Sequence, residues 1–244
     1  MLLKLILLGV VLGCGLGAIR AAGRARIMLG LCALILLGTL AFLTVFGRSG
    51  GAEADTMDRS FESAAGRRLG VAIATDIEGG KIAKDGDRVV VGVLNLPLTT
   101  THTRDHAKAY LQGLMEGLKG APVEVLPCQE TYNQQAQSLI FGEGGGVDMM
   151  TVMANAARSI PDVGVFVTFA GLPSRANASR FQGLPPIYAF QGEQTAALAA
   201  HIRSGAVRGV VTFRPNADWM LKPDPAWTWE ELFDQWYVFV SPET

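Results

Sequence analysis

Residues 89–126 read VVVGVLNLPLTTTHTRDHAKAYLQGLMEGLKGAPVEVL and predict a strand, a helix and a second strand in succession. The opening run 89–94 is short and almost wholly apolar, which is typical of a strand covered on both faces. Within 103–119, Ala107, Tyr110, Leu111, Leu114 and Leu118 lie on one face of a helix. Parallel strands need a crossover of this kind, so the stretch predicts a βαβ unit.

The same alternation continues toward the C-terminus. Further strands are expected at 147–153, 163–169, 186–190, 207–213 and 237–240, and helices at 132–141, 154–159, 194–204 and 229–236. Apolar strands that alternate with helices predict the α/β class, with a doubly wound, mostly parallel sheet and right-handed crossovers. We therefore expect one α/β domain over residues 81–244, with 89–94 at or near the centre of its sheet.

Residues Arg88 to about Ser174 resemble one lobe of the type I periplasmic binding proteins. The resemblance rests on 112–118 (QGLMEGL), similar to that family's "G-x-x-x-G-L" first helix, and on 146–150 (GVDMM), similar to its "G-V-D-x-I" strand. It continues with 160–166 (IPDVGVF), similar to "I-P-V-V", and with 171–173 (GLP) after it. The resemblance implies one Rossmann-like lobe of a solute-binding protein. That family holds its ligand between two lobes, and this chain has residues for only one.

Charge divides the chain into two regions. The first 47 residues carry four basic residues and no acidic one, whereas the remaining 197 carry 17 basic and 22 acidic residues. With 49% hydrophobic residues and a mean hydropathy of +0.27, the chain is too apolar for one ordinary soluble domain. Segments 5–19 and 27–47 contain no charged residue, and a membrane-crossing helix needs about 20 apolar residues. The sequence therefore predicts two transmembrane helices, paired as a hairpin, within residues 1–47.

Basic residues in short loops mark the cytoplasmic side of a membrane protein. The predicted turn 20–26 holds Arg20, Arg24 and Arg26, so we expect the inner (cytoplasmic) membrane and a periplasmic, extracytoplasmic α/β domain. Two alternatives stay open: a cleaved signal peptide, and a lipoprotein cleaved before Cys14. Gly9, Gly13 and Gly17 recur every four residues, a spacing that lets membrane helices pack closely.

Residues 48–80 are interpreted as a linker followed by an amphipathic helix. Residues 48–55 (RSGGAEAD) are small and polar, and from Thr56 apolar residues recur at a spacing of four, from Met57 to Ile77. This helix is either a stalk that docks between membrane and domain or the first helix of the domain, packed on its sheet.

Polar side chains follow several of the predicted strands, where open α/β sheets bind ligands. The candidate ligand-binding residues are Asn95, Thr99, Thr100, Thr101, Gln129, Glu130, Asn155, Ser174, Gln191 and Arg214. They predict a possible small-molecule ligand at the carboxyl ends of the strands.

The sequence contains no recognisable set of catalytic residues, and it predicts neither an enzyme nor a cofactor. His102 and His106 share a helix face and could bind one metal ion, but their place at a helix start favours solvated capping residues, so no metal site is predicted. Cys128 is interpreted as a buried apolar filler. The acidic charge of residues 48–244 argues against nucleic acid as a partner.

Two functions are compatible with this reading. The first is an interaction or assembly subunit of an envelope complex, with the lipid bilayer and other envelope proteins or a second copy as partners. The alternative is a membrane-tethered module that binds or senses a small molecule, as the periplasmic binding proteins do. The paired apolar segments and the missing second lobe favour the first, and the polar strand ends favour the second.

Overall fold

The computed structural model describes residues 61–83, 86–140, 148–173, 181, 183–192, 196–218, 221, 224 and 226–243. The chain divides into two compact units, Met1–Thr56 and Met57–Thr244, and all of these residues belong to the second. Among them, no helix combines the length and the hydropathy that a membrane crossing requires. The predicted hairpin at 1–47 and the linker at 48–55 lie outside the described residues.

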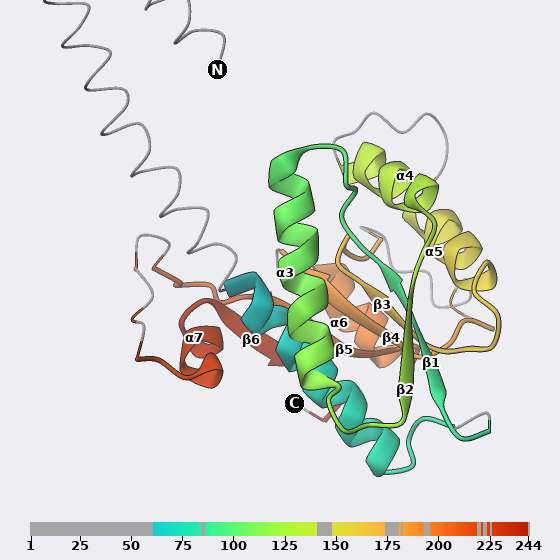
Figure 1. Ribbon diagram of the computed structural model, residues 1–244, viewed down its shortest axis with the longest axis horizontal. Helices are drawn as coiled ribbons and strands as arrows, with labels where there is room; N and C mark the ends of the chain where they lie inside the picture. The colour runs from blue at the N-terminus through green and yellow to red at the C-terminus, as the bar shows by residue number, and fades with distance from the viewer. Residues whose placement is uncertain are drawn as a thin grey trace, which may run out of the picture. The chain divides into compact units, whose positions relative to one another are not determined.

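The described residues form one sheet of six strands (Figure 1). The strands are β1 (Val89–Leu94), β2 (Val123–Pro127), β3 (Val163–Thr168), β4 (Ile187–Gln191), β5 (Val207–Phe213) and β6 (Tyr237–Val240). Their order is β2-β1-β3-β4-β5-β6, with the first five parallel and β6 antiparallel to β5. The predicted α/β class and mostly parallel sheet are thus confirmed. β1 lies second from one edge, however, and not at the centre.

Helices cover both faces of this sheet. They are α3 (Thr101–Gly117), α4 (Glu130–Ile140), α5 (Met149–Arg158), α6 (Ala196–Arg203), α7 (Trp229–Trp236) and a further helix whose described part is 61–78. One core joins helix 61–78, α3 and α7 to the sheet, and a second joins α4, α5 and α6 to the opposite face. Successive residues of β3 alternate between them, Val165 and Val167 in the first and Phe166 in the second, as the two-residue period of a strand requires.

The predicted strand at 147–153 is wrong, because α5 begins there. Asp148 is its N-cap and its carboxylate accepts a hydrogen bond from the Thr151 backbone N–H at 2.9 Å. Met150, Met153 and Ala157 then face the second core at helical spacing. A short apolar run fits a buried strand and a buried helix equally well by periodicity, and here the N-cap favours the helix.

Helix 61–78 and α3 cross in backbone contact through two pairs of glycines. A Cβ built on Gly113 would lie 2.7 Å from the Ser63 carbonyl carbon and 2.9 Å from the Arg67 nitrogen. One built on Gly117 would lie 2.9 Å from the Cα of Gly70. Around this crossing Phe61, Leu69 and Ile73 of helix 61–78 are fully buried in the first core. Helix 61–78 is therefore packed on the sheet by its whole apolar face.

Candidate functional site

The strand order places a topological switch point between β1 and β3. The chain leaves β1 through α3 to reach β2 on one side, and it returns through α4 and α5 to β3 on the other. The loops that follow β1 and β3 therefore diverge at the carboxyl edge of the sheet. Open α/β sheets bind ligands at such points, because the diverging loops leave a crevice between them.

Asn95, the first residue after β1, fixes the loop that leads to α3. Its side-chain N–H donates to the Ala107 carbonyl at 2.9 Å, and its side-chain oxygen accepts from the Leu96 N–H at 2.8 Å. Its backbone N–H donates to the side-chain oxygen of Asn133 at 3.1 Å. Asn95 is only 8% exposed, so it holds the loop and offers little to a ligand.

Glu130 extends this network from the start of α4. One of its carboxylate oxygens accepts from the Leu98 backbone N–H at 2.6 Å, and the other accepts from the Asn133 side-chain amide at 3.0 Å. The Leu98 carbonyl in turn accepts from the Arg104 guanidinium at 3.3 Å. Both the N–H and the carbonyl of Leu98 are therefore hydrogen-bonded to side chains, while the Leu98 side chain remains 46% exposed.

The three threonines at 99–101 are exposed, and the structure gives them different roles. Thr100 is the N-cap of α3, and with Thr103 it forms a capping box in which each side chain bonds the other's backbone N–H. The hydroxyls of Thr99 and Thr101 have no hydrogen-bond partner among the described residues. Of the predicted groups, these two hydroxyls and the side chain of Gln129, which is exposed after β2, can form hydrogen bonds with a solute.

A second loop at the same edge is held by Gln191, at the end of β4. Its side-chain oxygen accepts from the Leu172 N–H at 2.7 Å, beyond the positive-φ residue Gly171. Thr168, the fully buried last residue of β3, belongs to this loop network although it is not among the predicted residues. Its hydroxyl donates to the Gly171 carbonyl at 3.2 Å and accepts from the Ala170 N–H at 3.2 Å.

Three predicted residues are not part of this loop network. Asn155 is an exposed residue of α5 and follows no strand, because the strand expected at 147–153 does not exist. Arg214 follows β5 but turns toward α7 and β6, where its guanidinium lies 3.8 Å from the Asp234 carboxylate and donates to the Tyr237 carbonyl at 3.4 Å. Ser174 lies outside the described residues.

The two histidines of α3 form a chain with an acidic residue of helix 61–78. His106 bonds the Glu62 carboxylate through Nδ1, and its Nε2 lies 2.8 Å from a ring nitrogen of His102. His106 is buried, so it is not the solvated capping residue expected from its position. Its two nitrogens are occupied by these partners. Across the described ranges no group of three His, Cys, Asp or Glu residues is arranged to hold a metal ion.

Cys128, after β2, is buried in the second core as expected. Burial raises the pKa of its thiol to about 12, because the thiolate would lose its hydration there. The thiol therefore stays protonated at neutral pH and is not a nucleophile of this edge.

Comparison with solved structures finds similar proteins at low sequence identity. The chain is similar to GanP, a glucose-galactose binding protein from Geobacillus stearothermophilus, at 14% identity and a TM-score of 0.44, over 71% of this chain and 51% of that one. It is similar to a carbohydrate transporter solute-binding protein from Agrobacterium radiobacter, solved with D-arabinose, at 14% identity and a TM-score of 0.39, over 71% of this chain and 50% of that one.

A periplasmic solute-binding protein from Actinobacillus succinogenes with bound D-allose is similar at 10% identity and a TM-score of 0.41, over 62% of this chain and 47% of that one. This chain spans about half the length of these three proteins. No protein-family model matches the sequence, and no curated protein matches it.

Proposed function

We propose that the α/β unit binds a small polar solute at the carboxyl edge of its sheet, at the switch point between β1 and β3. The observation that carries the proposal is the loop 95–101, which is held by buried hydrogen bonds at Asn95 and exposed ones at Leu98 while it leaves hydroxyls exposed. Asn95 and Glu130 fix the backbone of this loop. The hydroxyls of Thr99 and Thr101 form no hydrogen bond with any described residue. A site whose polar groups are held before binding loses less entropy when its ligand arrives.

The chemistry of these groups favours a neutral, hydroxyl-rich solute. Thr99, Thr101 and Gln129 supply hydroxyls and an amide, which can each donate and accept hydrogen bonds. The similar solute-binding proteins hold D-arabinose and D-allose, so monosaccharides are the first class to test here.

A second candidate function is association, in which this domain works as an interaction or assembly subunit of an envelope complex. Leu98 favours it, because a 46% exposed leucine stands at the same edge on a loop fixed by Glu130 and Arg104. Small ligands usually have 70–90% of their surface buried, and one lobe supplies only one wall of a crevice. A partner seated on Leu98 would provide the other wall, so the two functions are compatible.

The place of the domain in the cell belongs to the same proposal. The arginine-rich turn at 20–26 supports an anchor in the inner membrane with the α/β unit in the periplasm. A cysteine introduced at Ser49 tests it, since Cys128 is buried. Modification by a membrane-impermeant thiol reagent, in cells whose outer membrane alone is permeabilised, is expected. Protection until the inner membrane is lysed would refute this placement.

Titration calorimetry of the purified full chain with a panel of monosaccharides tests the binding function. We expect saturable binding by at least one of them, weakened about tenfold when Thr99 and Thr101 are both changed to alanine, since each loses a hydrogen bond. The control is Thr75→Ala, an exposed threonine on helix 61–78 whose hydroxyl donates to the Val71 carbonyl. Equal weakening by both variants, or no saturable heat with any sugar of the panel, would contradict the proposal.

A further inference from the structure

β6 is an edge strand of the sheet formed by the described residues. It ends the sheet, with β5 on one side and no strand of the described chain on the other. The Arg214 N–H donates to the Trp236 carbonyl at 2.7 Å, so Arg214 and Trp236 form a hydrogen-bonded pair. In an antiparallel ladder every second pair is of this kind, so the next hydrogen-bonded pairs are Thr212–Val238 and Val210–Val240. Phe239, between them, turns its N–H and C=O away from β5. Neither group has a partner in the described part of the chain.

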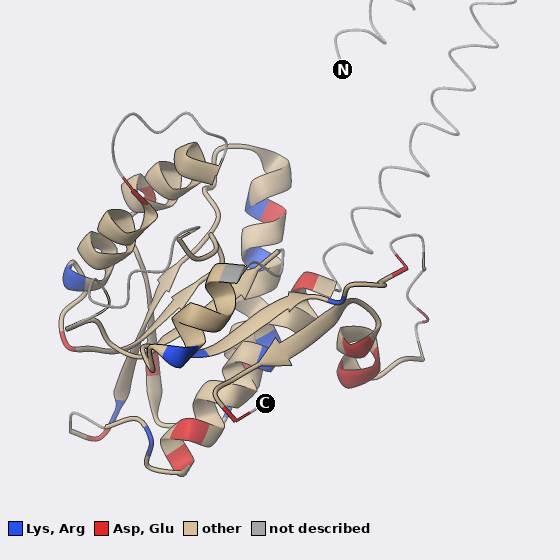
Figure 2. Ribbon diagram, turned by 180° about the vertical axis from the view of Figure 1, so that it is seen from behind, with Lys and Arg blue, Asp and Glu red and all other residues tan. Residues whose placement is uncertain are grey.

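The two edges of the sheet differ in how they discourage further pairing. Edge strands are usually protected by charged residues or proline. β2, at the other edge, carries exposed Glu124 and ends on Pro127. β6 reads Tyr-Val-Phe-Val and carries neither, and Figure 2 shows it as an uncharged ribbon beside the acidic helix α7. An unprotected edge of this kind is suited to receive another strand.

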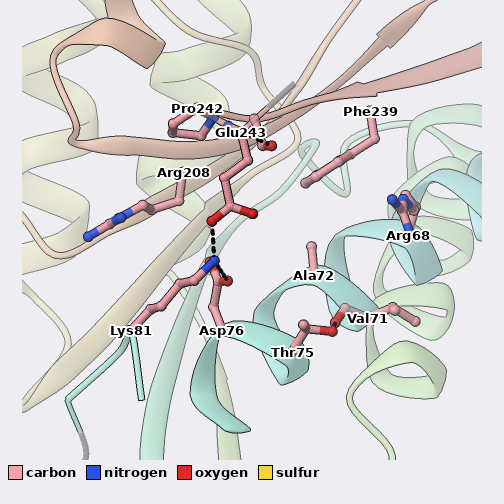
Figure 3. A pocket seen from close by; sticks show the side chains of 11 residues that line it. Arg68, Val71, Ala72, Thr75, Asp76, Lys81, Arg208, Phe239, Pro242 and Glu243 are labelled. Carbon is pink, nitrogen blue, oxygen red and sulfur yellow. Dashed lines mark hydrogen bonds and ion pairs between the residues drawn. The ribbon is translucent and has the colours of Figure 1, made fainter. Parts of the chain in front are cut away.

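Two cavities lie side by side along this edge. The larger, of about 480 Å³, lies between helix 61–78 and the segment 239–243 (Figure 3). The other, of about 360 Å³, lies between Arg68 and α7, with Trp229 and Phe233 among its lining residues. Arg68 and Phe239 line both cavities, so the two are neighbours with a shared wall, and we call the pair the β6 groove.

The β6 groove is lined by both basic and acidic side chains, with Glu230 and Asp234 of α7 in the smaller cavity, and two of its arginines have no carboxylate partner among the described residues. The guanidinium of Arg68 lies over the Phe239 ring, 4.8 Å from its centroid. Within the described residues, no carboxylate forms an ion pair with Arg68 or with Arg208, which lines the larger cavity. Lys81 differs, because it pairs with Glu243 and lies 3.4 Å from the Asp76 carboxylate. An acidic group is therefore the complement that Arg68 lacks.

We propose that the β6 groove binds an extended segment of a partner protein, which adds a strand to β6 and places an acidic side chain against Arg68. The segment's backbone bonds the N–H and C=O of Phe239, as in other cases of strand addition. Its apolar side chains meet Trp229 and Phe233 at one end of the groove and Val71 and Ala72 of helix 61–78 at the other. The β6 groove is separated from the switch point by three strands, so the two sites are independent.

A second copy of this chain is a poorer occupant. Its own free edge has the sequence Tyr-Val-Phe-Val, which carries no acidic residue for Arg68. Pairing of two β6 edges would also bring the Arg68 of each copy to the same interface, and like charges that face one another oppose association.

The test uses the purified full chain and a displayed library of random octapeptides. We expect enriched peptides that contain Asp or Glu among apolar residues, and their affinities are then measured by fluorescence anisotropy. Phe239→Ala retains the outward N–H and Phe239→Pro removes it, so we expect Phe239→Pro to bind about tenfold more weakly than Phe239→Ala. Because the Phe239 N–H is not bonded to β5, proline is tolerated there, and equal melting temperatures of the two variants would show it.

Arg68→Gln is the second arm, with Arg67→Gln as its matched control. Arg67 is the neighbouring residue, stacks on Trp229 at 4.9 Å and lines neither cavity. We expect Arg68→Gln to weaken the acidic peptides and Arg67→Gln to leave them unchanged. Equal binding by the two Phe239 variants, or a library without binders, would overturn the proposal. So would a dimer of the full chain that only Phe239→Pro dissociates, since it would assign the groove to a second copy.

Discussion

Gly113→Ala should strongly destabilise the domain, although alanine is the better helix former. The new Cβ would lie 2.7 Å from the Ser63 carbonyl carbon and closer still to its oxygen, where carbon–oxygen contacts need more than 3 Å. Both neighbours are helical backbone, so no rotamer change can relieve the clash. Overpacking of a core costs about 1–3 kcal/mol and alanine returns roughly 1 kcal/mol of helix propensity. Because two helices must separate, the upper end applies, and we expect a net loss of about 2 kcal/mol.

Chemical denaturation of the full chain, followed by circular dichroism, measures this loss. Gln112→Ala is the matched control, because it introduces the same residue one position earlier on α3, away from helix 61–78. We expect that control to change the free energy of unfolding by less than about 0.5 kcal/mol, as surface substitutions do. If Gly113→Ala is as stable as the parent protein, or more stable, the close crossing of the two helices is wrong.

Three further predictions follow from the fold and the site. Glu130→Gln should cost about 1–2 kcal/mol of unfolding free energy and loosen the Leu98 loop, because one of two hydrogen bonds to a carboxylate is lost; faster amide exchange at Leu98 checks it. Val91→Asp should prevent folding, since it buries a carboxylate at a fully buried position of β1; a melting curve like the parent's would be the contrary result. The pKa of the Cys128 thiol is near 9 in the unfolded chain and about 12 in the folded one. The stability that this difference contributes is fully present below pH 9 and is lost as the pH rises toward 12. We expect a loss of about 1 kcal/mol between pH 8 and pH 10, absent in Cys128→Ala, by denaturation at both pH values.

The elements that sequence reasoning located best are those with a local physical signature. β1 is buried on both faces, so its apolar run has the composition of a strand at every position. α7 begins at Trp229 because Thr228 and Glu231 form a capping box, a pattern contained in four consecutive residues. The segment 147–153 has no such decisive signature. Asp148 identifies the start of a helix only when the residues after it are already known to be helical.

The candidate site was located by a rule of topology, and the roles of its residues depend on tertiary contacts. Asn95 and Gln191 lie at the strand ends as expected, yet each is used to hold a loop. Whether a polar side chain faces a ligand or a backbone amide depends on partners such as Asn133, which lies 38 residues from Asn95. The glycines of the helix crossing were likewise visible as a motif, but their function depends on which helix lies opposite.

Hydrogen–deuterium exchange of the full chain, with and without a saturating monosaccharide identified by the titration panel, tests the central claim most directly. Solute bound at the β1/β3 switch point should slow exchange of the amides at 95–101 and 128–133, while helix 61–78 and segment 238–243 exchange unchanged. Slowed exchange confined to those last two segments, or none at the carboxyl edge, would contradict the account.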